Sequence, residues 1–195
     1  NLRVVGNYFS CPNLVSQDGC YTSSLFSNVS FYGNEVTNVS NANASKQTHS
    51  VYFSTDSNYI DVGWNYIHDN QACHDIQFHS SPLVVGTGFN QFDLRVHDNI
   101  IHDGRCSGIN FATVDPSKGT VEAYNNLIYR MGKGPAPFDG ASANTCIYMA
   151  GYTNNGAAGG GNIDVYSNTF YDCGSGGSSF GIHGGFQVNS NNPNL

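Results

Sequence analysis

The sequence repeats one short unit six times, and this repetition limits the possible folds more than any other feature. In each unit a short apolar stretch leads to an asparagine, and a second apolar stretch begins directly after it. The asparagines are 27, 31, 34, 27 and 42 residues apart, so the additional residues of the longer steps must lie in loops. Periods of roughly 20 to 50 residues are typical of stacked units that cannot bury an apolar face alone. The repeated asparagines are Asn7, Asn34, Asn65, Asn99, Asn126 and Asn168, and a partial seventh unit spans 188–191.

A further apolar segment lies between successive asparagines. These segments are short, alternate in polarity and are bounded by turn residues, so we expect them to be strands. Short strands without helical crossovers predict a solenoid whose successive turns, or rungs, pair in parallel about 4.8 Å apart. Equivalent residues then form columns along the solenoid axis. The predicted strands are 51–53, 76–78, 109–111, 147–149 and 182–184.

The asparagine column has two structural interpretations, which are compatible. Buried side-chain amides would hydrogen-bond from rung to rung, each bond contributing about 1 kcal/mol. In the other interpretation, asparagine occupies these positions because it tolerates a left-handed turn conformation.

This pattern resembles the right-handed parallel β-helix superfamily, often called pectin-lyase-like, over nearly the whole chain. The resemblance implies an all-β fold, a right-handed parallel β-helix of about six to seven rungs. A solenoid grows by repetition, so we expect a single domain over residues 1–195, with loop insertions near 133–144 and 152–162. The superfamily includes lyases, hydrolases, epimerases, phage tailspikes and adhesins, so the resemblance predicts the fold but not the activity.

The six cysteines, an even number, favour an oxidising compartment and three disulfides, and we expect a secreted protein that is extracellular or at the cell surface. Cys73 and Cys106 each precede the second strand of their unit by three residues, so they are predicted to be neighbours on successive rungs and to form a disulfide. Two other disulfides are predicted: Cys11–Cys20, which closes a short local loop, and Cys146–Cys173, which links two adjacent rungs.

The balance of charges excludes some partners. Lys and Arg number 7 against 14 Asp and Glu, giving a net charge of −7 and no basic stripe, so nucleic acid is not an expected partner. No run of eighteen apolar residues is present, so no membrane span is expected. The high aromatic content (13%) is typical of proteins that face carbohydrate. Three sequons give predicted glycosylation sites at Asn28, Asn38 and Asn43.

Candidate chemistry concentrates in the third and fourth units. His68 and His102 each follow the repeated asparagine by three residues, and the residues after them are Asp69 and Asp103. Paired imidazoles and carboxylates one rung apart would act as general acid and base, or would bind a divalent cation such as calcium. The structural alternative is a surface ladder of stacked rings, with Arg130 placed between carboxylates. Other polar residues expected nearby are His79, which completes the candidate catalytic set, and His74, Asp75, His97 and Asp98.

Several features of known relatives are missing. Lyases of the superfamily generally combine calcium-binding acids with a basic catalytic residue, but Arg95 and Arg105 are the only basic residues of the fourth unit. The paired-aspartate motifs of polygalacturonase-like hydrolases are absent. No Cys-x-x-Cys or Cys/His ligand spacing is present, so no resident metal or other cofactor is expected.

We therefore expect a non-enzymatic structural or adhesive surface module. Because uncapped solenoid ends expose unpaired strands, the expected partner is the protein itself, stacked end to end into a fibre. One alternative is a carbohydrate-active enzyme, a polysaccharide lyase or glycosidase working with the histidines and aspartates above. Another is a non-catalytic glycan binder whose partner is a polysaccharide, stacked on Tyr52, Tyr148, Tyr129 and Tyr171.

Overall fold

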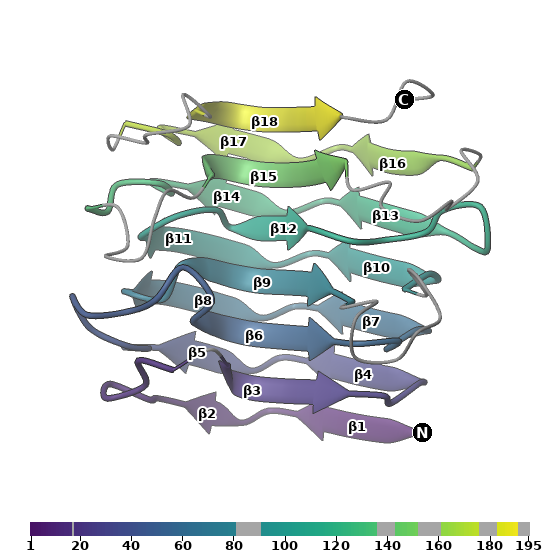
Figure 1. The fold of residues 1–195 in the computed structure, drawn as a ribbon, viewed down its shortest axis with the longest axis horizontal. Coiled ribbons are helices and arrows are strands. Elements are labelled where there is room, and N and C mark those ends of the chain that lie inside the picture. Colours follow the sequence, from purple (N-terminus) through teal and green to yellow (C-terminus); the bar gives the residue numbers. More distant parts are fainter. Residues whose placement is uncertain (17, 81–90, 136–142, 152–160, 176–182, 191–195) are drawn as a thin grey trace.

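The computed structural model describes residues 1–16, 18–80, 91–135, 143–151, 161–175 and 183–190. Within these residues the chain forms eighteen β-strands and no helix. The strands make three parallel sheets of six strands each, and every rung contributes one strand to each sheet (Figure 1). The protein is therefore a right-handed parallel β-helix, as predicted, with six rungs.

Each sheet contains the strands that occupy the same place in successive rungs. Sheet A consists of β1 (Leu2–Val5), β4 (Val29–Tyr32), β7 (Ile60–Gly63), β10 (Leu94–His97), β13 (Val121–Tyr124) and β16 (Ile163–Tyr166). Sheet B consists of β2 (Tyr8–Phe9), β5 (Glu35–Thr37), β8 (Tyr66–Asn70), β11 (Ile100–Gly104), β14 (Leu127–Tyr129) and β17 (Thr169–Tyr171). Sheet C consists of β3 (Gly19–Ser24), β6 (His49–Ser54), β9 (His74–His79), β12 (Ile109–Phe111), β15 (Asn144–Gly151) and β18 (His183–Ser190). In Figure 1 sheets A and B follow one another at the back, and sheet C lies in front of them.

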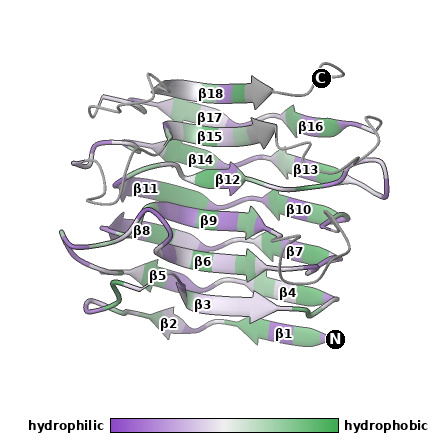
Figure 2. Ribbon diagram, viewed as in Figure 1, coloured by the Kyte–Doolittle hydropathy of each residue, from purple (hydrophilic) through white to green (hydrophobic). Residues whose placement is uncertain are grey.

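The core is built from inward-facing columns of apolar side chains, one residue per rung. In sheet C the rings of Phe53, Phe78 and Phe111 stack with centroids 5.1 and 5.3 Å apart. Each stacked pair contributes about 0.5–1.5 kcal/mol beyond the burial of its area. In sheet A more and less buried residues alternate along the strands, which gives each strand an apolar inner face. Figure 2 shows hydrophobic colour over much of these strands.

The six repeated asparagines form one hydrogen-bonded ladder along the turn between sheets A and B. From Asn34 to Asn168, each Oδ1 accepts two bonds from the asparagine one rung earlier, one from its backbone N–H and one from its Nδ2, at 2.8–3.1 Å. The same Nδ2 also reaches back, so that Asn99 donates to the carbonyl of Val62 at 3.0 Å. Each amide therefore links its own rung to the rung before it and the rung after it, which confirms the first interpretation of the column.

The second interpretation, in which the asparagines themselves adopt the left-handed conformation, is wrong by one residue. The left-handed conformation belongs to the residue that precedes each asparagine, because the backbone must reverse there before the amide can turn inward. These residues have φ between 52° and 68° and are Gly6, Gly33, Trp64, Asp98, Asn125 and Ser167.

The last predicted strand and the partial seventh unit are corrected. The predicted strand 182–184 is displaced, because Phe186 is the residue opposite Ile147 in sheet C. Val188 pairs with Met149 in the same sheet, and Asn189 lies opposite Ala150. Residues 188–190 are therefore the end of β18 and not a further rung of the asparagine ladder, and residue 191 lies outside the described residues.

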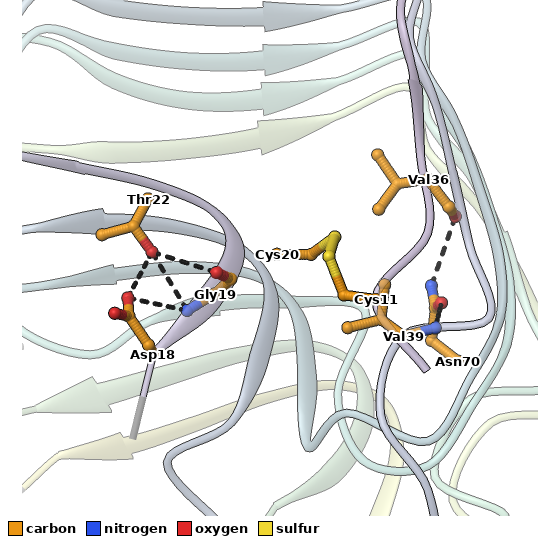
Figure 3. The surroundings of a disulfide bond; sticks show 8 residues. All are labelled: Cys11, Asp18, Gly19, Cys20, Thr22, Val36, Val39 and Asn70. Atoms are coloured by element: carbon orange, nitrogen blue, oxygen red, sulfur yellow. Dashed lines mark hydrogen bonds between the residues drawn. A yellow bond between two sulfur atoms is a disulfide. The ribbon is translucent and has the colours of Figure 1, made fainter. Parts of the chain in front are cut away.

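Two of the three predicted disulfides are present, Cys11–Cys20 and Cys146–Cys173. Figure 3 shows the first of them close to Asn70, a buried amide whose Oδ1 accepts the backbone N–H of Val39 at 2.9 Å. This bond ties together two successive rungs where the chain leaves sheet B.

The predicted Cys73–Cys106 disulfide is not formed, and both residues are buried thiols. Both cysteines lie outside the paired strands, since β9 begins at His74 and β12 at Ile109, and the register of the two strands begins with Ile76 opposite Ile109. Equal spacing from the strand in the sequence therefore does not by itself bring two sulfur atoms to disulfide geometry, which needs Cβ atoms about 3.8 Å apart.

The two predicted loop insertions fall mostly outside the described residues. Of 133–144, the structure describes 133–135 and 143–144, and Asn144 already begins β15. Of 152–162, it describes 161–162.

Candidate functional site

The predicted column of rings is present on the outer face of sheet B. His68 and His102 are opposite each other on β8 and β11, with ring centroids 5.4 Å apart and planes within 20° of parallel. Tyr129 on β14 continues the stack at 4.5 Å from His102, and Tyr171 pairs with it on β17. The rings of His68, His102 and Tyr129 therefore form a stacked ladder, and Tyr171 follows Tyr129 in the strand register.

Both nitrogens of each candidate catalytic histidine are engaged. The Nδ1 of His68 lies 2.7 Å from Asp69, and its Nε2 lies 3.3 Å from Glu35. The Nδ1 of His102 lies 2.6 Å from Asp103, and its Nε2 lies 3.0 Å from the hydroxyl of Tyr66. A metal ion or a substrate would therefore have to displace Glu35 or Tyr66 to reach the Nε2 of these imidazoles.

The aspartates of this column are held by their neighbours. Arg130 hydrogen-bonds to Asp103 through Nε (2.6 Å) and a terminal nitrogen, and this contact lowers the pKa of the Asp103 carboxyl to about 2. The guanidinium also lies over the ring of Tyr129, 4.7 Å from its centroid. Arg130 therefore engages one carboxylate rather than two, and Asp172 on the next rung pairs with Lys133 instead.

His79 does not join the other candidate residues. It lies at the far end of β9 in sheet C, whereas His68 and His102 lie in sheet B. Its Nδ1 is 3.3 Å from the hydroxyl of Tyr52, and burial lowers the pKa of its imidazole. The five residues of the predicted catalytic set therefore form no single cluster.

The four tyrosines proposed as stacking platforms are also divided between two sheets. Tyr52 and Tyr148 lie on strands β6 and β15 of sheet C and are half-buried. Tyr129 and Tyr171 lie on sheet B, and of the four only Tyr171 is largely exposed. A single sugar chain lying flat on one sheet would reach two of them at most.

A second polar cluster lies within sheet C around Asp75. Its Oδ1 accepts bonds from Ser50 (2.7 Å) and Asn70 (2.9 Å), while its Oδ2 has no hydrogen-bond partner among the described residues. Complete burial raises the pKa of this carboxyl to about 6. Nearby, burial also lowers the pKa of His49 well below its ordinary value, and its ring stacks on His74. These groups are enclosed and do not face a ligand.

A third arrangement lies on the outer face of sheet A, around His97. Its Nδ1 lies 2.8 Å from Asp98, and its Nε2 lies 2.8 Å from Asp61 one rung earlier. The ring stacks on Tyr124 with centroids 5.0 Å apart. Gly63 makes room for it, since a Cβ at that position would lie 2.6 Å from the His97 ring.

The sequence contained a signal for this arrangement. Four His-Asp dipeptides occur in the chain, and in three of them the imidazole Nδ1 bonds to the aspartate that follows. Each of these aspartates takes the left-handed conformation, which short polar side chains tolerate. The partner at Nε2, by contrast, comes from another rung and is visible only in the fold.

The third rung differs from its neighbours in carrying three aromatic side chains that are about half exposed. They are Tyr59 (51%), Trp64 (59%) and Tyr66 (40%). Tyr59 and Trp64 bracket β7 and both have left-handed backbone, at φ 54° and 56°. The Trp64 ring makes T-shaped contacts with the rings of Tyr32 and His97, with centroids 5.3 and 4.7 Å away, and more than half of its surface stays exposed.

Two hollows open beside this aromatic group on sheet A. One, of about 290 Å³, is lined by Tyr59, Asp61, Asp93 and Arg95 together with Ile60. The other, of about 330 Å³, shares Tyr59 and Asp61 and continues toward the first rung, past Arg3 and Asn28. Nothing in the local sequence around Tyr59, Asp61 or Trp64 indicates a binding role, so the sequence alone does not predict this group.

The three sequon asparagines, Asn28, Asn38 and Asn43, all lie at exposed positions. Among the described residues no group of three or more His, Cys, Asp or Glu side chains is arranged to hold a metal ion. In the same part of the chain no helix is long and apolar enough to cross a membrane. Comparisons with protein families, with curated proteins and with solved structures give no match.

Proposed function

We propose that the protein is an extracellular β-helix surface module with an adhesive role, which binds polysaccharide through the aromatic side chains of its third rung and does not cleave it. The observation that carries the proposal is Trp64. The equivalent positions of the other five rungs hold Gly, Asp, Asn or Ser, which tolerate left-handed backbone. A bulky residue in this conformation costs about 1–2 kcal/mol, and a ring that stays 59% exposed regains little of that by burial. A strained and exposed tryptophan is best explained by a contact outside the chain.

The chemistry of the third rung suits a sugar ring. Exposed aromatic faces stack on flat apolar surfaces, and the tyrosine hydroxyls can hydrogen-bond at the same time. An extracellular location is supported by the two disulfides and by the three exposed sequons. Membership of the pectin-lyase-like superfamily is part of the same proposal, supported by the three parallel sheets and the asparagine ladder.

Catalysis by a polysaccharide lyase or glycosidase has weaker support. The enzyme alternative needs His68 or His102 to exchange a proton with a substrate, or to bind a divalent cation, through a nitrogen that already has a partner. It also needs His79 in the same cluster, and His79 is in another sheet.

The test measures binding and cleavage of the same polysaccharides. The wild-type protein, Trp64→Gly and the aromatic control Tyr166→Ala, an exposed tyrosine of the sixth rung, are incubated with insoluble cellulose, insoluble chitin and soluble polygalacturonate, and bound protein and released reducing ends are measured. We expect binding without new reducing ends, and weaker binding for Trp64→Gly, whose melting temperature should equal or exceed that of the wild type because the strain is relieved. Release of sugars that is abolished by His102→Ala would contradict the proposal and favour the enzyme.

A second candidate function, end-to-end assembly into a fibre, rests on a different observation. Phe186 and Val188 continue the inward columns of Ile147 and Met149, yet each is 44% exposed. An apolar rung of this kind matches the inward columns of a second copy, which would bury it by parallel pairing. Electron microscopy and size-exclusion chromatography test this: filaments in the wild type that are lost in Phe186→Ser support assembly, and a monomer at high concentration contradicts it.

A further inference from the structure

We infer that the two hollows beside Asp61 on sheet A form a binding site for an uncharged saccharide, with Tyr59 as its stacking platform and Asp61 as its main hydrogen-bond acceptor. The inference rests on the proposed function and names the class of ligand for it. It concerns a surface of sheet A, separate from the histidine column of sheet B.

The two hollows have the size and continuity that a short sugar chain needs. They have volumes of about 290 and 330 Å³ and share Tyr59 and Asp61, so they form one trough that runs along the axis. The trough extends from Arg3 on the first rung to Arg95 on the fourth. Three rung spacings of about 4.8 Å give it a length of roughly 14 Å, which accommodates a few linked sugar rings.

Tyr59 has the same unusual combination of features as Trp64. The residues opposite it in the neighbouring rungs are Asn28 and Asp93, both left-handed and both of types that tolerate this conformation. Tyr59 is left-handed as well, but its ring is 51% exposed and makes a T-shaped contact with Phe92, with centroids 5.6 Å apart. Burial therefore offsets the strain only in part, and Tyr59 lines both hollows.

Asp61 is a fixed acceptor that still faces the trough. Its Oδ1 accepts a hydrogen bond from the Nε2 of His97 at 2.8 Å. His97 is in turn held by Asp98 and by its stack on Tyr124. The carboxylate nevertheless remains 30% exposed. A ligand hydroxyl that donates to it meets a group already held in position, so little entropy is lost on binding.

The charges of the trough favour hydroxyl groups over ions. Two carboxylates, Asp61 and Asp93, and two guanidinium groups, Arg3 and Arg95, line it, so their formal charges cancel. Arg95 is in addition shared with Glu122, at 3.3 Å. A uronate would meet two guanidinium groups but also two carboxylates, and a cationic sugar the reverse, so neither kind of ion gains a net attraction. A neutral sugar can donate hydroxyl protons to the acids and accept from the arginines, as small polar ligands do in such sites.

Isothermal titration calorimetry tests the site with defined oligosaccharides. Cellohexaose, xylohexaose and mannohexaose serve as neutral probes and hexagalacturonate as the acidic one, each titrated into the wild type, Tyr59→Ala, Asp61→Asn and Tyr166→Ala. Asparagine keeps an acceptor for His97, so Asp61→Asn preserves the fold, and thermal melting checks all variants. Tyr166 is a matched control because it is an exposed tyrosine of sheet A on the sixth rung, away from the trough.

We expect the wild type to bind at least one neutral hexasaccharide more tightly than hexagalacturonate. Tyr59→Ala and Asp61→Asn should each weaken that binding roughly tenfold, as expected when a stacking face or a hydrogen bond to a charged group is lost, and Tyr166→Ala should not change it. Saccharide binding that is unaffected by Tyr59→Ala and Asp61→Asn, or a preference for hexagalacturonate, overturns this site while leaving the proposed function intact. No binding of any saccharide to the wild type, here or in the polysaccharide test, overturns both.

Discussion

Replacing Asp75 with asparagine should remove one large component of the pH dependence of stability. Burial raises the pKa of this carboxyl from 3.8 to about 6, although Ser50 and Asn70 both hydrogen-bond to it. The folded protein therefore keeps the proton at pH values where the unfolded chain has lost it. Asp75 does not penalise folding below pH 3.8, destabilises the fold progressively as the pH rises from 3.8 to about 6, and keeps that full penalty at higher pH. A shift of this size corresponds to about 3 kcal/mol.

Urea unfolding of the wild type and of Asp75→Asn at pH 4, 5, 6 and 7 measures this component. The amide of the variant fills the same space but does not ionise, and any cost of its additional N–H groups is the same at every pH. The difference in unfolding free energy between the two proteins should therefore move by about 2.4 kcal/mol in favour of the variant between pH 4 and pH 7, or by roughly 5–10 °C in melting temperature. A difference that stays constant over this range, or moves in favour of the wild type, would refute the assignment of Asp75 as a buried and ionisable carboxyl.

Three further predictions follow from other described contacts. Asn99→Ala should destabilise the fold by about 3 kcal/mol in urea unfolding, because it removes the acceptor of the buried Asn65 backbone N–H and of one Asn65 amide N–H, and the donor to the carbonyl of Val62, whereas Asn125→Gly on the exposed side of the next turn should stay within about 0.5 kcal/mol. Arg130→Ala should raise the pKa of Asp103 from about 2 toward 3.8 in a carboxyl-carbon NMR titration, since the stabilising Asp103 carboxylate is present above about pH 4 in the wild type and is lost only as the pH falls through about 2; an unchanged titration would contradict the ion pair. The unreduced, denatured chain should react with two equivalents of a thiol reagent and the native chain with none, because Cys73 and Cys106 are buried thiols, and the absence of reaction after denaturation would show a third disulfide.

The features that the sequence predicted well are those that every rung repeats. Asn65, Asn99 and their equivalents recur because one backbone turn needs the same amide in each rung, so a comparison of the units is enough to find the ladder and the sheets. The left-handed residue before each asparagine was missed because Gly, Trp, Asp, Asn and Ser all occupy it. What these residues share is a backbone angle and not a side chain.

The candidate site was harder to predict because its residues are exceptions to the repeat. His79 was grouped with His68 on grounds of sequence proximity, but the short turn after Asn70 carries the chain into a different sheet. Tyr59 and Trp64 become visible only when the rungs are aligned in their correct register and each is seen to replace a small or polar residue. Similarly, Cys73 and Cys106 occupy equivalent positions in successive units, but equal spacing in the sequence does not make two thiols a disulfide.

The asparagine ladder has a consequence for the length of the molecule. Each amide makes the same bonds to the turn before it and the turn after it, whatever the size of the intervening loops, so a segment such as 99–125, which is 27 residues long, behaves as an interchangeable cassette. Duplication of that segment in frame would lengthen the molecule by about 4.8 Å without altering its cross-section. Unequal recombination within such a gene can therefore adjust how far the protein reaches in whole steps, and each step preserves the geometry on which the next one is built.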